Sequence, residues 1–239
     1  MRPDDVAYQL SMAAAYREKA RRSGMISAMR NAKKWKAVLE HTVETWPENL
    51  EARRWLVRYL LHAPGIGGGD KDRALELSGE TMAVDAYEGR LLIAYSHRRR
   101  GERGVAVAMY DSCVAIYPDS ARVWGAYAYT LLVAQRLEPA QELFETWVVV
   151  APEDPEAHAG LGDWAVAAEQ FDVAEAAFRR ALEVDPYYSQ ARYDLARMLE
   201  DNREYKEARE EYSAIVALTP EFLKVGDAKK RAYKLRKKK

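Results

Sequence analysis

The sequence lacks the features that usually indicate a disulfide scaffold, a membrane protein or a metal enzyme. Its single cysteine, Cys113, excludes a disulfide within the chain, and no apolar run approaches the roughly 18 residues of a membrane-spanning helix. The four histidines are scattered, and no pair has the spacing of a metal-binding motif. We therefore expect no metal, no cofactor and no catalytic residue, and we interpret Cys113 as a buried, inert core residue.

The formal net charge is zero, because 37 Lys and Arg balance 37 Asp and Glu. The positive and negative residues are nevertheless separated along the chain. Basic residues are in excess in residues 1–60 and again after residue 223, whereas residues 138–185 are strongly acidic. We interpret these regions mainly as solvated helix faces with a solubilising C-terminal tail. The alternative is that the basic ends, above all the Lys/Arg-rich tail, bind an anionic surface, either a membrane or nucleic acid.

What the sequence does contain is an internal repeat. Pro118, Pro152, Pro186 and Pro220 follow one another at a constant interval of 34 residues. Each follows an alanine-rich segment that carries an aromatic residue. A fixed interval of this size indicates one helix–turn–helix unit copied along the chain.

Small and aromatic residues recur in phase with these prolines. Small residues allow two helices to approach closely, and the aromatic residues fill the space between units. The proline ends the second helix, because it disfavours a helical conformation in the residue before it. The recurring small residues are Ala106, Ala140, Ala174 and Ala208, and the recurring aromatic residues are Tyr110, Phe144, Phe178 and Tyr212.

This pattern resembles the tetratricopeptide repeat over roughly the last 135 residues. The resemblance implies an all-α, right-handed superhelical solenoid of about six helix–turn–helix units with a C-terminal capping helix. In the strongest copy, residues 155–188, the residues that match the family pattern are Leu161, Gly162, Ala174, Phe178, Ala181 and Pro186.

Continuing the frame toward the N-terminus gives two units that depart from the pattern. In the first we expect helices at residues 4–22 and from about residue 31 to 45, with an unusually long connection around Ser23-Gly24. The second contains a glycine-rich loop, residues 63–70, about five residues longer than the repeat requires. We predict a single solenoid over residues 1–239, with units at approximately 4–48, 49–86, 87–120, 121–154, 155–188 and 189–222 and a basic capping helix and tail at 223–239.

The modified first unit and the glycine-rich loop, a Pro-Gly-Gly-rich insertion, together resemble a set of bacterial tetratricopeptide proteins of poorly defined role. No catalytic residues are known for that set. Members of that set often have export signals. Here residues 1–5 lead directly into an amphipathic helix, without the apolar core of a signal peptide. We therefore expect a cytoplasmic protein, and the alternative is a periplasmic protein whose signal peptide has been removed.

The resemblance also implies which residues face a partner, because the first helices of tetratricopeptide units line the concave face. Arginine and aromatic residues are enriched in binding hot spots, and a peptide with acidic and apolar side chains suits such a set. The asparagines of the chaperone-type carboxylate clamp are absent, so that ligand class is not implied. The alternative is that some of the tyrosines pack within the stack. The predicted partner-binding residues are Arg54, Arg58, Tyr95, Tyr129, Asp163, Tyr193 and Arg197.

The glycine-rich loop is the one feature that suggests a small ligand. It lacks the Gly-Lys-Ser/Thr ending of a phosphate-binding P-loop, and no strand precedes it. The amides of Gly67, Gly68 and Gly69 could still meet an anion at the start of the next helix, where Asp70 is the predicted N-cap. We interpret the loop as a tight structural turn, with an anion site as the alternative.

These patterns predict a noncatalytic scaffold that binds a protein or peptide of unknown identity in its concave groove, with no small-molecule substrate. The first alternative is an envelope- or assembly-associated protein that uses its basic ends on an anionic surface. A weaker alternative is an accessory subunit that binds a ligand through the glycine-rich loop and a concave pocket. Loss of binding as salt rises would favour the anionic surface. Loss of binding after Tyr129→Ala and Arg197→Ala would favour the groove.

Overall fold

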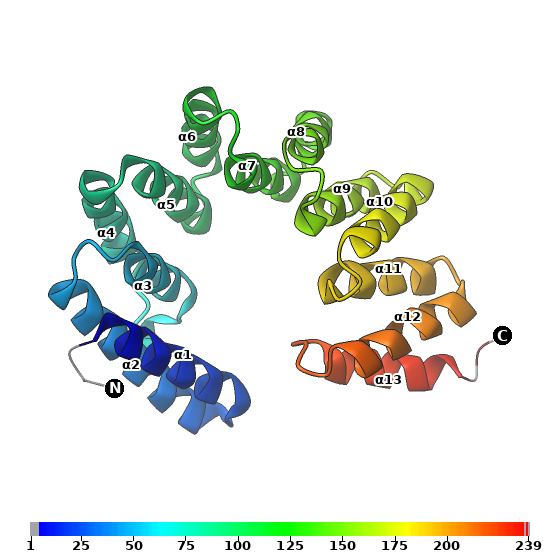
Figure 1. Cartoon of the computed structure of the whole chain (residues 1–239), viewed down its shortest axis with the longest axis horizontal. Coiled ribbons are helices and arrows are strands. Elements are labelled where there is room, and N and C mark those ends of the chain that lie inside the picture. The colour runs from blue at the N-terminus through cyan, green and yellow to red at the C-terminus, as the bar shows by residue number, and fades with distance from the viewer. Residues whose placement is uncertain (1–4, 237, 239) are drawn as a thin grey trace. The chain divides into compact units, whose positions relative to one another are not determined.

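The structure is a computed structural model that describes residues 5–236 and 238 (Figure 1). In this part of the chain, thirteen α-helices and one 3₁₀ turn follow one another and no strand is present, which confirms the predicted all-α class. The elements are α1 (Val6–Arg22), α2 (Met25–Thr45), α3 (Leu50–His62), η1 (Gly65–Gly67), α4 (Lys71–Val84), α5 (Ala86–Arg100), α6 (Arg103–Ile116), α7 (Ala121–Val133), α8 (Leu137–Val150), α9 (Pro155–Ala167), α10 (Phe171–Val184), α11 (Ser189–Asp201), α12 (Tyr205–Leu218) and α13 (Val225–Leu235).

The helices belong to two compact units: an N-terminal unit, Met1–Ile116, with α1 to α6, and a C-terminal unit, Tyr117–Lys239, with α7 to α13. Inside each unit, consecutive helices pack against each other as hairpins, beginning with α1 on α2 and with α7 on α8 (Figure 1). The first helices of neighbouring hairpins also touch, α3 with α5, α7 with α9 and α9 with α11. Neighbouring hairpins therefore bury faces that one helix pair alone would leave exposed.

Three-residue turns join the two helices of each hairpin in the C-terminal unit. The middle residues of these turns, Gln135, Glu169 and Arg203, have positive φ angles of 59°, 57° and 68°. The following residue returns a backbone hydrogen bond to the first helix, such as the 2.8 Å bond from the Gln170 amide to the Ala165 carbonyl. The left-handed residue therefore reverses the chain within three residues.

The predicted close-packing positions are confirmed. The four recurring alanines are fully buried, and the four recurring aromatic side chains are at most 1% exposed. A Cβ atom on Gly162 would lie 2.6 Å from Cε1 of Phe178, well inside van der Waals contact. Gly125 has the same relationship to the ring of Trp147, also at 2.6 Å. A larger residue at either position would push the two helices of the hairpin apart.

One side-chain hydrogen bond recurs where one repeat follows another. A side chain in the first turn of the new helix donates to the carbonyl of the proline six residues before it. Because a carbonyl only accepts, His158 must carry a proton on Nε2. These bonds tie the start of each first helix to the preceding turn. The donor–acceptor pairs are Arg53–Pro47, Trp124–Pro118, His158–Pro152 and Arg192–Pro186.

The prediction of a long connection within the first hairpin is wrong. Helix α2 begins at Met25, well before the expected start near residue 31, so that only Ser23 and Gly24 separate it from α1. Ser23 and Gly24 are both extended, with φ and ψ angles of −95° and 156° and of −64° and 160°, and together they turn the chain. Residue 4, where we expected the first helix to begin, lies outside the described residues. Helix α1 begins at Val6, after the N-cap Asp5.

The two other special segments are confirmed. Residues 63–70 connect α3 to α4 through η1, where the hairpins of the C-terminal unit have three-residue turns. Helix α13 packs on α12 and buries Ala228, Ala232 and Leu235, as expected of a capping helix.

Cys113 is buried as predicted, and burial raises the pKa of its thiol. None of the helices in the described residues is long and apolar enough to cross a membrane.

Candidate functional site

A cavity of about 400 Å³ lies between α2, α3, α5 and the glycine-rich loop of the N-terminal unit. Its size is in the range of ligand and side-chain pockets. Arg58 and Tyr95, two of the predicted partner-binding residues, contribute to its lining. The lining residues are Ala32, Trp35, Arg58, Tyr59, His62, Ala63, Pro64 and Tyr95.

Trp35 and Tyr59 form an aromatic wall of this cavity. Their ring centroids are 5.1 Å apart at an interplanar angle of 87°, the edge-to-face geometry that aromatic pairs favour. The hydroxyl of the buried Tyr59 donates a 2.6 Å hydrogen bond to the carbonyl of Gly67, and burial raises the pKa of this hydroxyl. The glycine-rich loop is therefore fastened directly to the wall.

The three glycines of the possible anion site use their amides inside the loop. The amides of Gly67 and Gly69 donate to the carbonyl of Pro64 at 2.8 and 3.1 Å, and the amide of Gly68 donates to another loop carbonyl at 2.8 Å. Gly68 has φ +88°, a conformation that favours glycine. Asp70 is the N-cap of α4, as predicted. The geometry supports the structural turn and leaves these three amides unavailable to an anion.

His62 and Tyr95 are hydrogen-bonded to each other beside the cavity. Their rings stack with centroids 6.1 Å apart, and Nε2 of His62 contacts the hydroxyl of Tyr95. Arg99 donates to Nδ1 of His62 at 3.3 Å, and because arginine has no acceptor, the imidazole proton must sit on Nε2. Partial burial and the charges of Arg99, Arg58 and Arg98 lower the pKa of His62, which keeps it neutral.

Positive charge lies beside the cavity: Arg58 lines it, and Arg98 and Arg99 contact the lining residues Tyr95 and His62. Arg58, Arg98 and Arg99 have no carboxylate partner among the described residues, and Arg98 lies over the Tyr95 ring at 5.1 Å. Nε of Arg98 and the indole nitrogen of Trp35 are both buried without a hydrogen-bond acceptor in the described part of the chain. An unpaired buried donor destabilises a protein by about 1–3 kcal/mol.

Arg54, the remaining predicted residue of the N-terminal unit, does not reach the cavity lining. Its guanidinium pairs with the carboxylate of Glu88 at 3.1 Å, from α3 to α5. Glu88 is almost completely buried, whereas Arg54 is about one-third exposed. This ion pair connects two adjacent hairpins, so the charge of Arg54 is already used within the fold.

Three of the four predicted residues of the C-terminal unit are engaged in hydrogen bonds within the fold. The hydroxyl of Tyr129 donates to Asp163 at 2.9 Å, and the hydroxyl of Tyr193 donates to Asp227 at 2.6 Å. Tyr193 is buried. Arg197 is exposed and has no ion pair among the described residues. Of these predicted residues, Arg197 is the one that offers an unpaired charge in the described chain.

Asp163 lies in a partly buried electrostatic cluster. Burial raises the pKa of Asp163 to about 7, and the negative charge of Asp194 adds to the shift. The hydrogen bond from Tyr129 and the charges of Lys224 and Arg197 act in the opposite direction. Burial also raises the pKa of Asp194. Asp163 therefore titrates near neutral pH.

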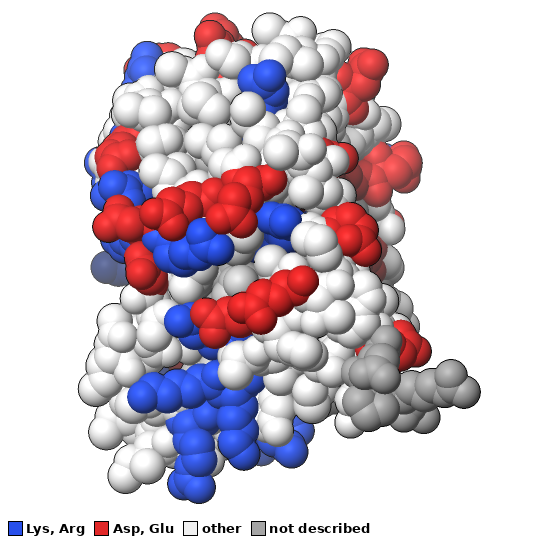
Figure 2. Space-filling model, turned by 90° about the vertical axis from the view of Figure 1, so that its left-hand side faces the viewer, with Lys and Arg blue, Asp and Glu red and all other residues white. Residues whose placement is uncertain are grey.

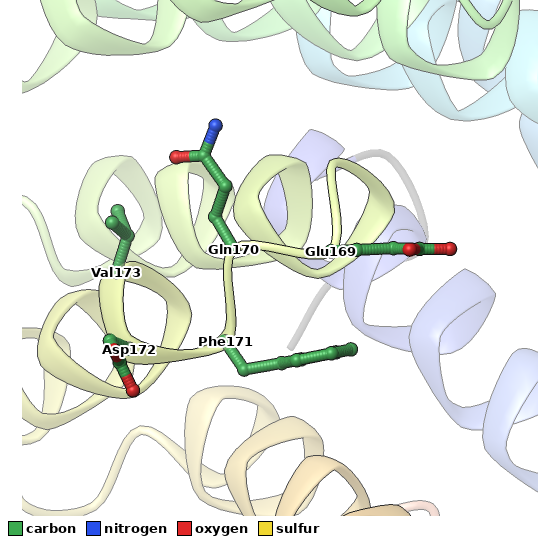
Figure 3. A pocket seen from close by; sticks show the side chains of 5 residues that line it. All are labelled: Glu169, Gln170, Phe171, Asp172 and Val173. Atoms are coloured by element: carbon green, nitrogen blue, oxygen red, sulfur yellow. The ribbon is translucent and has the colours of Figure 1, made fainter.

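A second hollow, of about 390 Å³, lies at the turn between α9 and α10. Its lining consists of five consecutive residues, 169–173. Figure 3 shows Gln170 and Val173 pointing to one side of the chain and Glu169 and Phe171 pointing to another. Because no polar groups converge there, we assign it no ligand. In the described residues, no group of three or more His, Cys, Asp or Glu side chains could hold a metal ion.

The basic C-terminal segment is partly engaged in the fold. Arg231 of α13 pairs with Glu200 at 2.8 Å and with Asp227 at 2.7 Å. Contact between this segment and an anionic surface stays a prediction. The exposed lysines of α13 are Lys229, Lys230 and Lys234, while Lys237 and Lys239 lie outside the described residues.

Three cavity residues, Trp35, Tyr59 and His62, were not predicted as binding residues. Trp35 and Tyr59 match ordinary apolar core positions, and an isolated histidine carries no motif. A usable signal was nevertheless present. Arg58 and His62 are four residues apart on one helix, and Tyr95 follows His62 by about one repeat length, which brings equivalent helix positions side by side.

Comparison with protein-family models gives two adjacent matches. Models described as "Tetratricopeptide repeat" match residues 98–163 and residues 160–221. Together they span residues 98–221, more than half of the 239-residue chain. No curated protein matches the sequence.

Several solved structures have a similar fold. TTC0263, a thermophilic TPR protein of Thermus thermophilus, is 19% identical, with a TM-score of 0.61 over 77% of this chain and 98% of that chain. MamA of Desulfovibrio magneticus RS-1, from residue 41 to its end, is 20% identical, with a TM-score of 0.54 over 72% and 96% of the two chains. Yeast Tom70 is 16% identical, with a TM-score of 0.62 over 93% of this chain and 46% of Tom70. At these identities the similarity concerns the fold alone.

Proposed function

This chain belongs to the tetratricopeptide repeat family, and on that premise we propose that it is a noncatalytic scaffold that binds a segment of a partner protein in the cavity of the N-terminal unit. The segment carries a bulky apolar side chain next to a carboxylate. The observation that carries this proposal is an aromatic cavity of about 400 Å³ beside three arginines that have no carboxylate partner in the described chain.

The apolar part of the partner would bury itself against Trp35, Tyr59 and Tyr95. Aromatic side chains supply a large contact area, and their edge-to-face contacts add about 0.5–1.5 kcal/mol beyond the burial of area. Tyr59 is already fixed by its hydrogen bond to Gly67, and Tyr95 by its bond to His62. Because these side chains are ordered before binding, little rotamer entropy is lost when the partner arrives.

The acidic part of the partner would meet Arg58, Arg98 and Arg99. Charge-assisted hydrogen bonds from a guanidinium to a carboxylate are roughly twice as strong as neutral ones. The neutral state of His62 leaves these arginines as the charges that select an acidic segment over a basic one. In the C-terminal unit we propose Arg197 as a further contact for an acidic partner, since the charge of Arg197 is unpaired in the described chain.

A random-peptide phage library, panned on the purified full chain, tests the proposal. We expect the selected peptides to share an acidic residue within two or three positions of Trp, Phe, Tyr or Leu. They should lose binding to the double variant Arg58→Ala/Tyr95→Ala by at least about tenfold, or about 1.4 kcal/mol. Thermal unfolding of the variant establishes that it remains folded.

A matched control removes the same residue types elsewhere. Arg180→Ala/Tyr187→Ala changes an exposed arginine and an exposed tyrosine of the C-terminal unit and should leave binding unchanged. Peptides that bind the Arg58→Ala/Tyr95→Ala variant as tightly as the wild type, or a selection that enriches no acidic and apolar pattern, would contradict the proposal.

A further inference from the structure

The tip of the α1–α2 hairpin exposes two large apolar side chains. Met25 and Ile26, the first residues of α2, are 81% and 78% exposed. They follow the two-residue turn Ser23-Gly24, so they project at the very end of the hairpin. Single exposed apolar side chains are common on protein surfaces, but an adjacent exposed pair bordered by polar residues fits a contact surface.

The same tip is strongly basic. Residues 16–34 contain seven Lys and Arg and one acidic residue, Glu18. Figure 2, which views the left-hand side of Figure 1, shows Lys and Arg side chains gathered at the lower end, where α1 and α2 lie. All seven basic side chains are exposed: Arg17, Lys19, Arg21, Arg22, Arg30, Lys33 and Lys34.

The backbone adds to this positive field. Gly24 precedes α2 and provides no side-chain cap, so the first amides of α2 have no side-chain acceptor there. The N-terminus of a helix carries a partial positive charge. From Ile26, the residues Arg30 and Lys33 follow at steps of four and three, so that the basic side chains continue along one face of α2 away from the apolar tip.

We propose that the α1–α2 tip docks on an anionic lipid bilayer. Met25 and Ile26 enter the boundary between headgroups and acyl chains, and the surrounding Lys and Arg side chains bind the lipid phosphates. An apolar tip ringed by basic residues has the chemistry of an interfacial membrane anchor. Nucleic acid would satisfy the charges but would offer no apolar layer for the two aliphatic side chains, so the lipid surface fits both features.

Co-sedimentation with vesicles tests this proposal on the full chain. The probe is vesicles of phosphatidylglycerol and phosphatidylcholine in equal parts, compared with pure phosphatidylcholine. We expect binding to the mixed vesicles alone. Each basic side chain near an anionic surface should strengthen binding about fivefold, so Arg30→Gln/Lys33→Gln/Lys34→Gln should weaken it at least about tenfold.

The chain supplies a matched charge control at its other basic end. Lys229→Gln/Lys230→Gln/Lys234→Gln removes three exposed lysines of α13 and should change vesicle binding by less than about twofold if the α1–α2 tip is the anchor. A larger loss with the α13 variant than with the α2 variant would overturn the proposal and place the contact on the C-terminal segment.

The apolar contribution is tested separately. Met25→Ser/Ile26→Ser should weaken binding to the mixed vesicles at least about tenfold. The control Val149→Ser/Leu223→Ser, which changes two apolar residues that are 78% and 68% exposed in the C-terminal unit, should not. Equal losses in the two variants would overturn the assignment of the tip.

A direct readout of insertion completes the test. A polarity-sensitive fluorophore on Met25→Cys should shift to shorter wavelength with the mixed vesicles and remain unshifted with duplex DNA, while the buried Cys113 stays unlabelled. An unshifted label with the mixed vesicles would overturn insertion into lipid. The same conclusion would follow if the Met25→Ser/Ile26→Ser variant lost binding to duplex DNA to the same extent as it lost binding to the vesicles.

Discussion

The hydroxyl of Tyr129 donates a 2.9 Å hydrogen bond to Asp163, the residue that occupies the same place one repeat later. Tyr193 and Asp227 are separated by the same interval and are joined at 2.6 Å. A repeat brings equivalent positions of successive units side by side, so a polar residue at such a position readily finds its partner one period away. Part of the predicted binding face therefore connects one helix hairpin to the next within the C-terminal unit.

The Tyr129–Asp163 pair predicts a pH dependence of stability. The folded pKa of Asp163 is about 7, against 3.8 for an ordinary carboxyl group. Between these pH values the folded state binds more protons than the unfolded state, so stability should fall as pH rises from about 4 to about 7 and then level off. Asp163→Asn removes this titration. Relative to the wild type, the variant should gain about 1–3 kcal/mol between pH 4 and pH 8.

Urea unfolding at a series of pH values measures this difference. Asp172→Asn, a change of an exposed carboxylate in the same unit, serves as the control. A wild-type profile that runs parallel to that of Asp163→Asn across the whole range would contradict the assignment.

The contact between Gly162 and Phe178 predicts a packing cycle. Gly162→Ala should destabilise the protein by about 1–3 kcal/mol, because the new Cβ would stand 2.6 Å from the Phe178 ring. Phe178→Ala should cost about 3–5 kcal/mol through the cavity it leaves. In a Phe178→Leu background the cost of Gly162→Ala should shrink by at least about 0.5 kcal/mol, as expected for residues in contact.

Denaturant unfolding of the single and double variants measures this coupling. Gly79→Ala is a suitable control, because nothing lies within 4 Å of a Cβ at that place in α4, and alanine should be neutral or stabilising there. If the changes in the free energy of unfolding caused by Gly162→Ala and Phe178→Leu add up in the double variant, the two side chains do not constrain each other's packing.

The recurring bond to proline carbonyls predicts a modest but specific effect. Trp124→Phe keeps most of the ring but removes the Nε1 donor that lies 2.6 Å from the Pro118 carbonyl. The free energy of unfolding should fall by about 1 kcal/mol. If urea unfolding shows that the free energy of unfolding falls by less than a few tenths of a kcal/mol, the bond does not stabilise the start of α7.

The Tyr59–Gly67 bond predicts local loosening of the glycine-rich loop. Tyr59→Phe should leave the Trp35–Tyr59 ring contact in place but release the loop carbonyl, at a cost of about 1–2 kcal/mol. Hydrogen exchange should accelerate in residues 63–70 and remain unchanged in α11 and α12. Unchanged exchange in the loop would contradict the role given to this bond.

The fold could be read from the sequence because its signals are periodic. Proline, alanine and aromatic residues at 34-residue steps indicate how the helix pairs pack. Gly162 lies where the packing leaves no room for a Cβ atom. The start of α2 was missed because it departs from that period. Near Gly24 no proline marks the boundary, and the helix simply begins at Met25.

The cavity could be predicted only in part. The tetratricopeptide pattern indicated Arg58 and Tyr95, because it assigns inward places within each unit. It could not indicate Trp35 or the state of His62, since these depend on how α2 and the inserted loop pack against α3. Nor could it reveal that Arg54 is neutralised by Glu88, because an ion pair depends on side-chain placement.

A charge-reversal cycle is the most direct test that the cavity of the N-terminal unit binds an acidic and apolar segment. Binding of a peptide selected on the wild-type protein is measured by calorimetry with the wild type and with Arg58→Glu, each against the peptide and its version with lysine in place of the acidic residue. We predict that Arg58→Glu weakens the acidic peptide at least about tenfold and that the lysine version recovers binding to this variant alone. Equal affinity of the acidic peptide for both proteins would contradict a carboxylate contact at Arg58.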